Sequence, residues 1–225
     1  CMACNCLMSV TSTALFCYDC SKTYKLNSGN TCRVCGKPVG EFADLVCASC
    51  KSTRIYYESN VSRYLYRGCI KDAIQNMKFK RRKWIAFEFA KALCKTVSEH
   101  FEGINFDAVI PVPMTKLDEK TRGFNQSKVF AEIISEHLGV TYDDTVLYKK
   151  VGAKTQSGLG RKERLANVKN SYIILEPDRI VDKVVLLVDD VFTTGATMNE
   201  CARVLKKAGA VAVFGITAAT TAFGE

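Results

Sequence analysis

The stretch Val184–Met198, VVLLVDDVFTTGATM, decides the fold of this 225-residue chain. Its first five residues are all valine or leucine, which is typical of a strand buried on both faces of a parallel sheet. Asp189 and Asp190 follow at the carboxyl end of that strand, where open α/β sheets bind their ligands. The small residues after them predict exposed backbone N–H groups at the start of a helix, which suit a phosphate.

Paired carboxylates beside a phosphate cradle suit a ligand with vicinal hydroxyls next to a phosphate, which describes a ribose 5-phosphate. A plain strand–turn–helix, in which the aspartates only cap the helix, is the alternative. The complete string favours the sugar phosphate, because it resembles the signature of type I phosphoribosyltransferases. The resemblance implies that Asp189 and Asp190 are catalytic and hold the ribose hydroxyls or the shell of a metal. It assigns the 5-phosphate cradle to Thr193, Thr194, Gly195, Ala196 and Thr197.

The composition is that of an ordinary globular protein, with 48% hydrophobic residues, 24% charged residues and a formal charge of +9. The length allows one mid-sized domain with a small appendage. No window approaches 18 consecutive apolar residues, so we expect no membrane span, and we recognise no secretory signal. Because the chain begins with Cys1, we expect that a few residues precede it in the full protein.

Eight of the twelve cysteines form four Cys-x-x-Cys pairs, which are separated by 12, 11 and 11 residues. Each pair offers two thiolates to a tetrahedral ion and a second pair completes the shell, so we expect two structural Zn²⁺ sites. Redox dithiols are the alternative, but a redox motif would not repeat four times. Metal-binding cysteines also favour a reducing compartment, the cytoplasm. The expected ligands are Cys1, Cys4, Cys17, Cys20, Cys32, Cys35, Cys47 and Cys50.

Sequential pairing places the first four ligands on one ion and the last four on the other, and a cross-braced arrangement stays open. We therefore expect a double zinc ribbon over residues 1–57 and a phosphoribosyltransferase-like domain over residues 58–225. Glutamine amidophosphoribosyltransferases use an N-terminal cysteine as nucleophile, but Cys1 belongs to a zinc pair and the chain leaves no room for a glutaminase domain. Ordinary buried thiols are expected at Cys6, Cys69, Cys94 and Cys201.

Residues 61–95 hold ten lysines and arginines against two acidic residues. The densest part, KFKRRKW over residues 78–84, separates two segments of helical periodicity. A solvated loop is one interpretation. The other is a surface for single-stranded DNA, whose bases would stack on the flanking aromatic rings. The predicted phosphate contacts in that case are Lys80, Arg81, Arg82 and Lys83.

A second apolar strand, over residues 106–112, ends in Pro-Val-Pro and leads to Arg-Gly-Phe-Asn-Gln at residues 122–126. Because this loop follows a parallel strand, we expect it at the ligand end of the sheet. Arg122 offers a guanidinium to a second phosphate group, and Gly123 lets the backbone approach it. Apolar runs at residues 145–148 and 171–175 predict further strands of the parallel sheet.

Four features together resemble the ComF family over essentially the whole chain: the cysteine-rich head, Pro-Val-Pro, Arg-Gly-Phe-Asn-Gln and Asp-Asp-Val-Phe-Thr-Thr-Gly-Ala-Thr. The resemblance implies an α/β fold, the type I phosphoribosyltransferase fold with a parallel sheet flanked by helices. It implies that phosphoribosyl pyrophosphate binds with Mg²⁺, with its pyrophosphate at Arg122. It also implies a role in DNA uptake during natural transformation, with single-stranded DNA and a competence helicase or processing protein as partners.

The glycine-rich segment of residues 149–161 is either a surface loop or a lid that closes over the substrate, as in type I phosphoribosyltransferases. The lid interpretation assigns Lys154 to the leaving pyrophosphate, and Gln156 and Arg164 fit the spacing seen in ComF proteins. Purine-salvage members usually place a carboxylate where this chain has Thr193, which counts against purine salvage. Two functions stay open: phosphoribosyl transfer to an unidentified acceptor, or a non-catalytic DNA-binding factor with the same fold.

Overall fold

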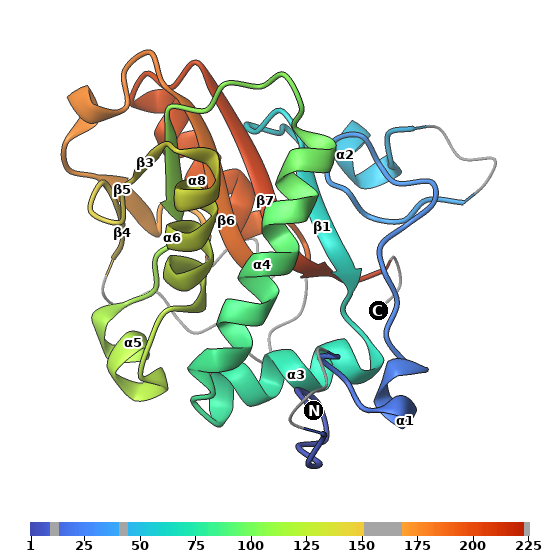
Figure 1. The fold of residues 1–225 in the computed structure, drawn as a ribbon. Coiled ribbons are helices and arrows are strands. Elements are labelled where there is room, and N and C mark those ends of the chain that lie inside the picture. The colour runs from blue at the N-terminus through green and yellow to red at the C-terminus, as the bar shows by residue number, and fades with distance from the viewer. Residues whose placement is uncertain (10–13, 41–44, 151–167, 223–225) are drawn as a thin grey trace.

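The computed structural model of the protein describes residues 1–9, 14–40, 45–150 and 168–222. Its centre is a sheet of five parallel strands in the order β1-β7-β6-β2-β3 (Figure 1). The predicted α/β fold with a parallel sheet flanked by helices is therefore confirmed. These strands are β1 (Asn60–Leu65), β2 (Ala108–Pro111), β3 (Thr141–Tyr142), β6 (Val184–Phe192) and β7 (Ala212–Thr220).

Two of the helices begin at a residue whose side chain caps them. Asn125 starts α6 by accepting a hydrogen bond from the backbone N–H of Ser127, and Gly139 ends it with a left-handed φ of 67°. The sequence patterns did not predict α5, which starts at the capping residue Thr115. The helices are α1 (Tyr18–Ser21), α2 (Ala48–Ser52), α3 (Gly68–Phe79), α4 (Lys83–His100), α5 (Lys116–Arg122), α6 (Gln126–Leu138), the 3-10 helix η1 (Pro177–Arg179) and α8 (Ala196–Lys207).

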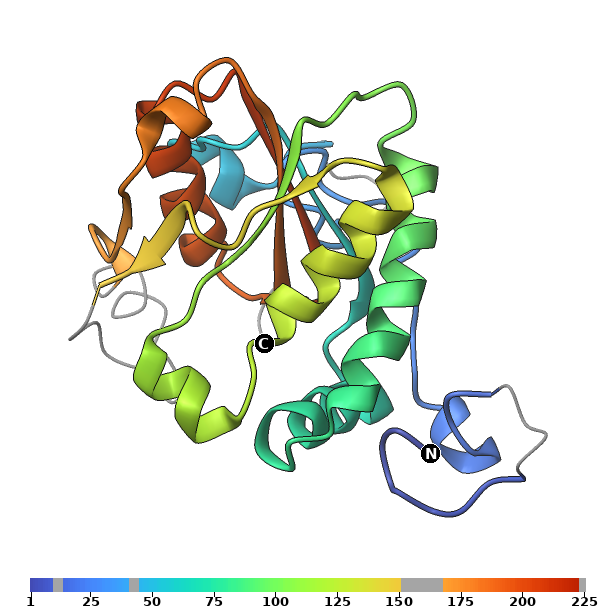
Figure 2. The ribbon, with the colours of Figure 1, turned by 60° about the vertical axis from the view of Figure 1, so that its left-hand side comes forward.

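Strand β6 is apolar throughout its first half because both of its faces are covered. Leu186 and Val188 belong to a core that α3, α4 and α6 build on one face of the sheet. Val185 and Leu187 belong to a second core, which α8 builds on the other face. Figure 2 shows the sheet between these two layers of helices. The uninterrupted Val/Leu run thus reflects the burial of both faces of this strand in a parallel sheet.

The two halves of the cysteine-rich head pack on opposite faces of the sheet. Met2 and Phe16 lie in the core with α3 and α4, whereas Cys32, Cys35 and Cys47 lie in the core with α8. In Figure 1 the segment around α1 accordingly lies far from the segment around α2. The boundary near residue 57 stays a prediction.

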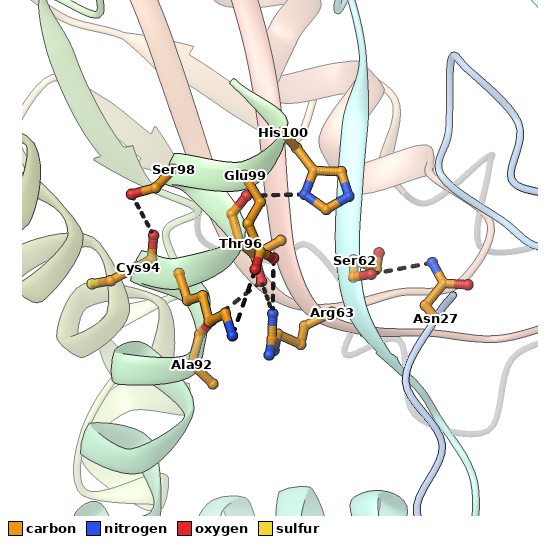
Figure 3. A network of polar contacts seen from close by, with 10 residues as sticks. Asn27, Ser62, Arg63, Ala92, Cys94, Thr96, Ser98, Glu99 and His100 are labelled. Carbon is orange, nitrogen blue, oxygen red and sulfur yellow. Dashed lines mark hydrogen bonds and ion pairs between the residues drawn. The ribbon is translucent and has the colours of Figure 1, made fainter. Parts of the chain in front are cut away.

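The edge strand β1 forms hydrogen bonds both with α4 and with the cysteine-rich head. Arg63 donates from Nη1 to Thr96 Oγ1 at 3.0 Å and to Glu99 Oε2 at 3.4 Å, which ties the strand to α4 (Figure 3). From the cysteine-rich head, Asn27 Nδ2 donates to the carbonyl of Ser62 at 3.1 Å (Figure 3). The head therefore covers a sheet edge that would otherwise expose unpaired backbone groups.

The strands predicted at residues 145–148 and 171–175 exist, but their place in the parallel sheet was wrong. They are the short strands β4 (Leu147–Lys149) and β5 (Tyr172–Ile174), which pair antiparallel with each other in a separate sheet. Leu147 and Tyr172 are buried in the core next to α8, so burial alone produced the apolar pattern. Within the described ranges, no helix combines the length and apolar character that crossing a membrane requires.

Candidate active site and metal centres

Strands β2 and β6 are neighbours in the sheet, but the helices that follow them cover opposite faces. Helix α6 comes after β2, and α8 comes after β6 (Figure 2). This is a topological switch point, the position at which open parallel sheets bind ligands beyond the carboxyl ends of their strands. A cavity of about 380 Å³ opens there. Its lining includes Lys78, Val112, Pro113, Arg122, Gln126, Ser127, Tyr172, Asp189, Asp190, Thr193, Gly195, Ala196 and Thr197.

Three side chains hold the acid pair at the floor of this cavity. Lys78 Nζ lies 2.8 Å from Oδ1 and 2.7 Å from Oδ2 of Asp190, which is 8% exposed. Gln126 Nε2 donates to Asp190 Oδ2 at 2.9 Å, and Ser127 Oγ donates to Asp189 Oδ1 at 3.1 Å. Carboxylate oxygens are the ligands that Mg²⁺ prefers, and in this structure those of Asp190 are paired with the Lys78 ammonium. The donor set therefore fits Mg²⁺.

Asp189 does not titrate like an exposed carboxylate. Burial and, to a smaller extent, the charge of Asp190 raise the pKa of Asp189 to about 7, although the Asp190 backbone N–H, Lys78 and Ser127 act in the opposite direction. Two carboxylates in one low-dielectric site repel each other, so one of them retains its proton to an unusually high pH. The site thus contains an acid that changes charge near neutral pH.

The Arg-Gly-Phe-Asn-Gln loop reaches the cavity mainly through its last residues. Asn125 donates from Nδ2 to the carbonyl of Val112 at 3.1 Å, which anchors the start of α6 beside the end of β2. That anchor directs Gln126 toward the acid pair. Arg122 lines the cavity and donates from Nη1 to Gln126 Oε1 at 3.4 Å. Gly123 ends α5 with a φ of 94°, so its structural role there is to reverse the chain.

The predicted phosphate cradle forms the turn between β6 and α8. Gly195 has a φ of 78°, and a Cβ placed on it would lie 2.5 Å from Cζ of Phe192. Only glycine therefore fits the turn without moving the ring. Thr194 Oγ1 accepts a hydrogen bond from the backbone N–H of Ala196, the first residue of α8, at 3.3 Å.

The structure places four of the five predicted cradle residues in the cavity wall, together with both aspartates and Arg122. Sequence reasoning missed Lys78, Gln126 and Ser127 as site residues. Gln126 is the last residue of the Arg-Gly-Phe-Asn-Gln motif, and Ser127 comes directly after it. Because this motif was predicted to face the ligand, its position could have identified both residues. No sequence signal could have identified Lys78, because it lies 112 residues from Asp190 in the chain. The predicted lid residues Lys154, Gln156 and Arg164 lie outside the described residues.

The second cysteine group has the geometry of a metal site. The thiols of Cys32, Cys35, Cys47 and Cys50 all lie within 4.8 Å of one another, and the first three are buried. The Sγ atoms of Cys35 and Cys47 are 3.7 Å apart. Four sulfurs about 2.3 Å from a tetrahedral Zn²⁺ are about 3.8 Å apart, so this spacing matches a closed site. In addition, the backbone N–H of Cys47 donates to Cys32 Sγ at 3.3 Å, as is suitable for a thiolate.

The first cysteine group differs from the predicted one in a single ligand. Among the described cysteines, the thiols that lie within 4.8 Å of one another are those of Cys1, Cys4, Cys6 and Cys17. The interpretation of Cys6 as a buried thiol is wrong, because it is exposed and completes this group. The predicted ligand Cys20 lies outside this set of four.

A tight turn at Asn5 explains why Cys6 joins the first group. Asn5 has a left-handed φ of 68°, and its backbone N–H donates to the carbonyl of Cys1 at 3.1 Å. The amino group of Cys1 in turn donates to the carbonyl of Cys6 at 3.0 Å. This local fold cannot be recognised from cysteine spacing. The remaining single cysteines Cys69, Cys94 and Cys201 are buried, as predicted.

The basic run of residues 80–83 spans the turn between α3 and α4 and ends at the first residue of α4. Two of its four cations contact other parts of the chain. Arg81 donates from Nη2 to the carbonyl of Thr121 at 2.8 Å, and Arg82 donates to Asn5 Oδ1. Lys80 and Lys83 are exposed. The flanking rings of Phe79 and Trp84 are 70% and 46% exposed, so an aromatic surface does accompany the charges.

Comparison with known proteins gives the family. A model of the phosphoribosyl transferase domain matches residues 125–222, which include α6, the acid pair and the turn between β6 and α8. Competence protein ComFC of Bacillus subtilis is 30% identical over 231 residues, which cover 94% of this chain and 90% of the relative. The chain belongs to the ComF family. Competence protein F of Haemophilus influenzae is 28% identical and covers 86% of this chain and 91% of its own, and DNA utilization protein YhgH of Escherichia coli is 28% identical and covers 88% and 86%.

Solved structures of phosphoribosyltransferases also match this ComF chain. Glutamine phosphoribosylpyrophosphate amidotransferase from Bacillus subtilis is 22% identical over 58% of this chain, with a TM-score of 0.40, and the match spans 26% of that larger protein. A purine phosphoribosyltransferase from Pyrococcus horikoshii is 20% identical over 61% of this chain and 85% of its own, with a TM-score of 0.34. At these TM-scores the ComF assignment rests on the sequence relatives and the domain match.

Proposed function

We propose that this ComF protein binds phosphoribosyl pyrophosphate with Mg²⁺ in the cavity at the switch point and acts in DNA uptake during natural transformation. One observation carries the ligand assignment. The acid pair at the end of β6 and the glycine turn before α8 line a single cavity, within the segment that matches the phosphoribosyl transferase domain. The competence role follows the names of the relatives. We also infer that the two cysteine groups hold structural Zn²⁺.

Each part of the ligand has a chemically suitable partner in the cavity. Ribose hydroxyls can donate to the carboxylates of Asp189 and Asp190, as in the type I signature. The 5-phosphate can accept hydrogen bonds from the backbone N–H groups at the start of α8, where the helix dipole also favours an anion. The guanidinium of Arg122 suits the pyrophosphate. Mg²⁺, when bound, neutralises charge on the pyrophosphate.

In this proposal the side chains of the site contribute mainly by electrostatic stabilisation of the transition state. As the pyrophosphate leaves C1 of the ribose, positive charge develops on the sugar ring. Ionised Asp189 and Asp190 lie together in the protein cavity, where fixed charges stabilise such a state more strongly than in water. Thr193 occupies the position of the usual purine-salvage carboxylate, so we propose an acceptor other than the purine bases of salvage enzymes.

A pyrophosphate-release assay separates an enzyme from a binding protein. The protein would be incubated with phosphoribosyl pyrophosphate, Mg²⁺ and a panel of bases, with the Asp189→Asn/Asp190→Asn double variant as control. Release that the double variant abolishes supports phosphoribosyl transfer. Binding without release supports a non-catalytic ComF factor that uses the sugar phosphate as a ligand. Release at equal rates by both proteins would contradict the assignment of the acid pair.

Binding of phosphoribosyl pyrophosphate should weaken as the pH falls below about 7. The pKa of Asp189 is raised to about 7, so the carboxylate that accepts the ribose hydroxyls becomes protonated below that value. One pH unit lower, about nine-tenths of the group is neutral, which predicts a loss of affinity of up to about tenfold. Calorimetric titrations from pH 8 to pH 6 measure this. The Asp189→Asn variant is the control, because any pH dependence of its affinity comes from titration of the ligand itself. An equal change of affinity with pH in the wild type and in this variant would contradict the role of Asp189.

A second candidate function is the binding of single-stranded DNA at the turn between α3 and α4. The exposed rings of Phe79 and Trp84 beside Lys80 and Lys83 favour it, because stacking on aromatic rings and phosphate neutralisation are the two contributions that bind single strands. Relatives named for competence and DNA utilization are consistent with this surface. The two functions are compatible within one ComF protein.

Reversing the two exposed lysines, Lys80→Glu/Lys83→Glu, should weaken single-stranded DNA binding by about tenfold or more. Losing two phosphate contacts should also lower the slope of log K against log salt by about 1.4. Gel shifts at several salt concentrations measure both effects. The double variant Lys71→Glu/Lys91→Glu changes the net charge equally outside the turn and serves as control. Equal losses in the two variants would show that overall charge, and not this surface, binds the DNA.

A further inference from the structure

The ion pair between Lys78 and Asp190 joins two elements that are distant in sequence. Lys78 belongs to the last turn of α3, and Asp190 lies near the end of β6. The ammonium lies within 2.8 Å of both carboxylate oxygens. The side chains are only 18% and 11% exposed, so the pair is shielded from water and its attraction is weakly screened. The cavity therefore contains its own cation.

This cation occupies both carboxylate oxygens of Asp190, which a metal ion at the acid pair would need. Asp190 Oδ1 accepts from Lys78, and Oδ2 accepts from both Lys78 and Gln126. Asp189 Oδ1 accepts from Ser127 and from the backbone N–H of Asp190. A divalent ion that enters the cavity without a phosphate ligand meets three carboxylate oxygens that already accept hydrogen bonds, and the positive charge of Lys78 beside them. Both features oppose its binding.

A phosphosugar changes this balance because it brings negative charge. Lys78 lines the same cavity as the phosphate turn and Arg122, so its ammonium faces the space that the ligand would fill. Phosphate oxygens offer the ammonium a new partner, which leaves Asp190 free for a metal or for the ribose hydroxyls. The helix itself need not move. Asn76 fixes α3 by donating from its buried Nδ2 to the carbonyls of Met2, at 2.9 Å, and Ala3.

We propose that Lys78 makes metal binding at the acid pair conditional on the phosphosugar, an inference that rests on the proposed function of this cavity. In the ligand-free protein Lys78 is the counter-ion of Asp190 and excludes divalent ions. In the complex it pairs with the anionic ligand. Lys78 is thus a specificity-determining residue of the site, because it excludes free metal and favours the metal together with the phosphosugar.

The test measures Mn²⁺ binding to the zinc-loaded protein by the electron paramagnetic resonance of free Mn²⁺. Mn²⁺ prefers oxygen ligands, so it reports the carboxylates and not the cysteine groups. Without ligand, Lys78→Met should bind Mn²⁺ at least about tenfold more tightly than the wild type, since a charge within 4 Å of a carboxylate shifts its affinity for a cation by this order. Lys78→Arg keeps the charge and should resemble the wild type. Lys71→Met removes an exposed lysine from the same helix and should change nothing.

The second part of the experiment repeats the Mn²⁺ titration in the presence of phosphoribosyl pyrophosphate. A titration of the ligand with Mn²⁺ in the absence of protein corrects for Mn²⁺ that the free ligand binds. The ligand should raise the affinity for Mn²⁺ strongly in the wild type and less in Lys78→Met, because the coupling between two ligands is lost with the residue that transmits it. Lys78→Gln is the second variant if Lys78→Met proves unstable on heating. The double variant Asp189→Asn/Asp190→Asn defines Mn²⁺ bound elsewhere.

The outcomes separate this inference from the proposed function. Unchanged Mn²⁺ affinity in folded Lys78→Met and Lys78→Gln overturns the inference, and a merely structural ion pair would give that result. Tighter Mn²⁺ binding in the variants together with no effect of phosphoribosyl pyrophosphate on any protein overturns the proposed ligand and its coupling to the metal. In that case the exclusion of free metal by Lys78 would still stand. Tighter binding with reduced coupling supports both.

Discussion

Gly195→Ala should weaken the binding of phosphoribosyl pyrophosphate by about a hundredfold or more, while the ComF chain stays folded. The added Cβ would lie 2.5 Å from Phe192 Cζ, and the φ of 78° is unfavourable for alanine. The left-handed conformation alone costs about 1–2 kcal/mol. The steric overlap adds to this and must displace the turn, since Phe192 is buried and packs edge-on against Tyr57 with ring centroids 6.4 Å apart. A hundredfold loss corresponds to about 2.8 kcal/mol.

Gly139→Ala is the matched control for this prediction. Gly139 has a similar φ of 67°, but a Cβ there would meet no atom within 4 Å. That variant therefore carries the backbone strain without the contact with Phe192, and it should bind the ligand like the wild type. Calorimetric titration of both variants measures the difference. Equal affinities for both alanine variants would mean that the turn does not hold the phosphate.

Cys35→Ser should remove one of two zinc equivalents and lower the melting temperature by about 10 °C or more. The second cysteine group is buried in the core next to α8, so the loss of its metal leaves uncompensated thiols and a void inside the fold. Structural zinc sites contribute many kcal/mol to folding. A loss of only about 4 kcal/mol shifts the melting temperature of a chain of this size by about 8–16 °C.

Metal analysis and thermal melting measure the two effects. Cys94→Ser is the control, because Cys94 is also buried but lies outside both cysteine groups. It should keep both zinc equivalents. The contact between Tyr57 and Phe192 connects the second cysteine group to the glycine turn before α8, so Cys35→Ser should also weaken ligand binding. Unchanged zinc content in Cys35→Ser would contradict a site with these four ligands.

The parts of the site that are continuous in sequence were predictable. The Val/Leu run, the acid pair and the glycine turn follow one another directly, and each has a local physical signature: two-sided burial, a ligand-facing strand end and a left-handed turn. The second cysteine group was predictable for a related reason, because two Cys-x-x-Cys turns form most of its ligand shell.

The parts that were not predictable depend on tertiary contacts. Lys78 is part of a basic run, where nothing distinguishes it from its neighbours until α3 packs beside the end of β6. In the same run, Arg81 and Arg82 were predicted to contact DNA phosphates. In the structure, their guanidinium groups donate to Thr121 and Asn5 of the chain itself.

Backbone conformation accounts for the other differences. Cys6 replaces Cys20 in the first group because Asn5 adopts a left-handed conformation, which the spacing of cysteines does not encode. β4 and β5 pair with each other outside the main sheet, although their apolar residues resemble those of a parallel strand. Helix α5 had local signals, the capping residue Thr115 with Asp118 and Glu119 in the first turn, and these were overlooked.

The central claim is that the acid pair and the glycine turn form a phosphoribosyl pyrophosphate site, and calorimetry tests it most directly. The zinc-loaded ComF protein would be titrated with phosphoribosyl pyrophosphate in the presence of Mg²⁺, beside the folded Asp189→Asn/Asp190→Asn variant. We predict saturable binding with one ligand per chain for the wild type and loss of that binding in the double variant. Absence of binding to the folded wild type, or equal affinity for both proteins, would contradict the account.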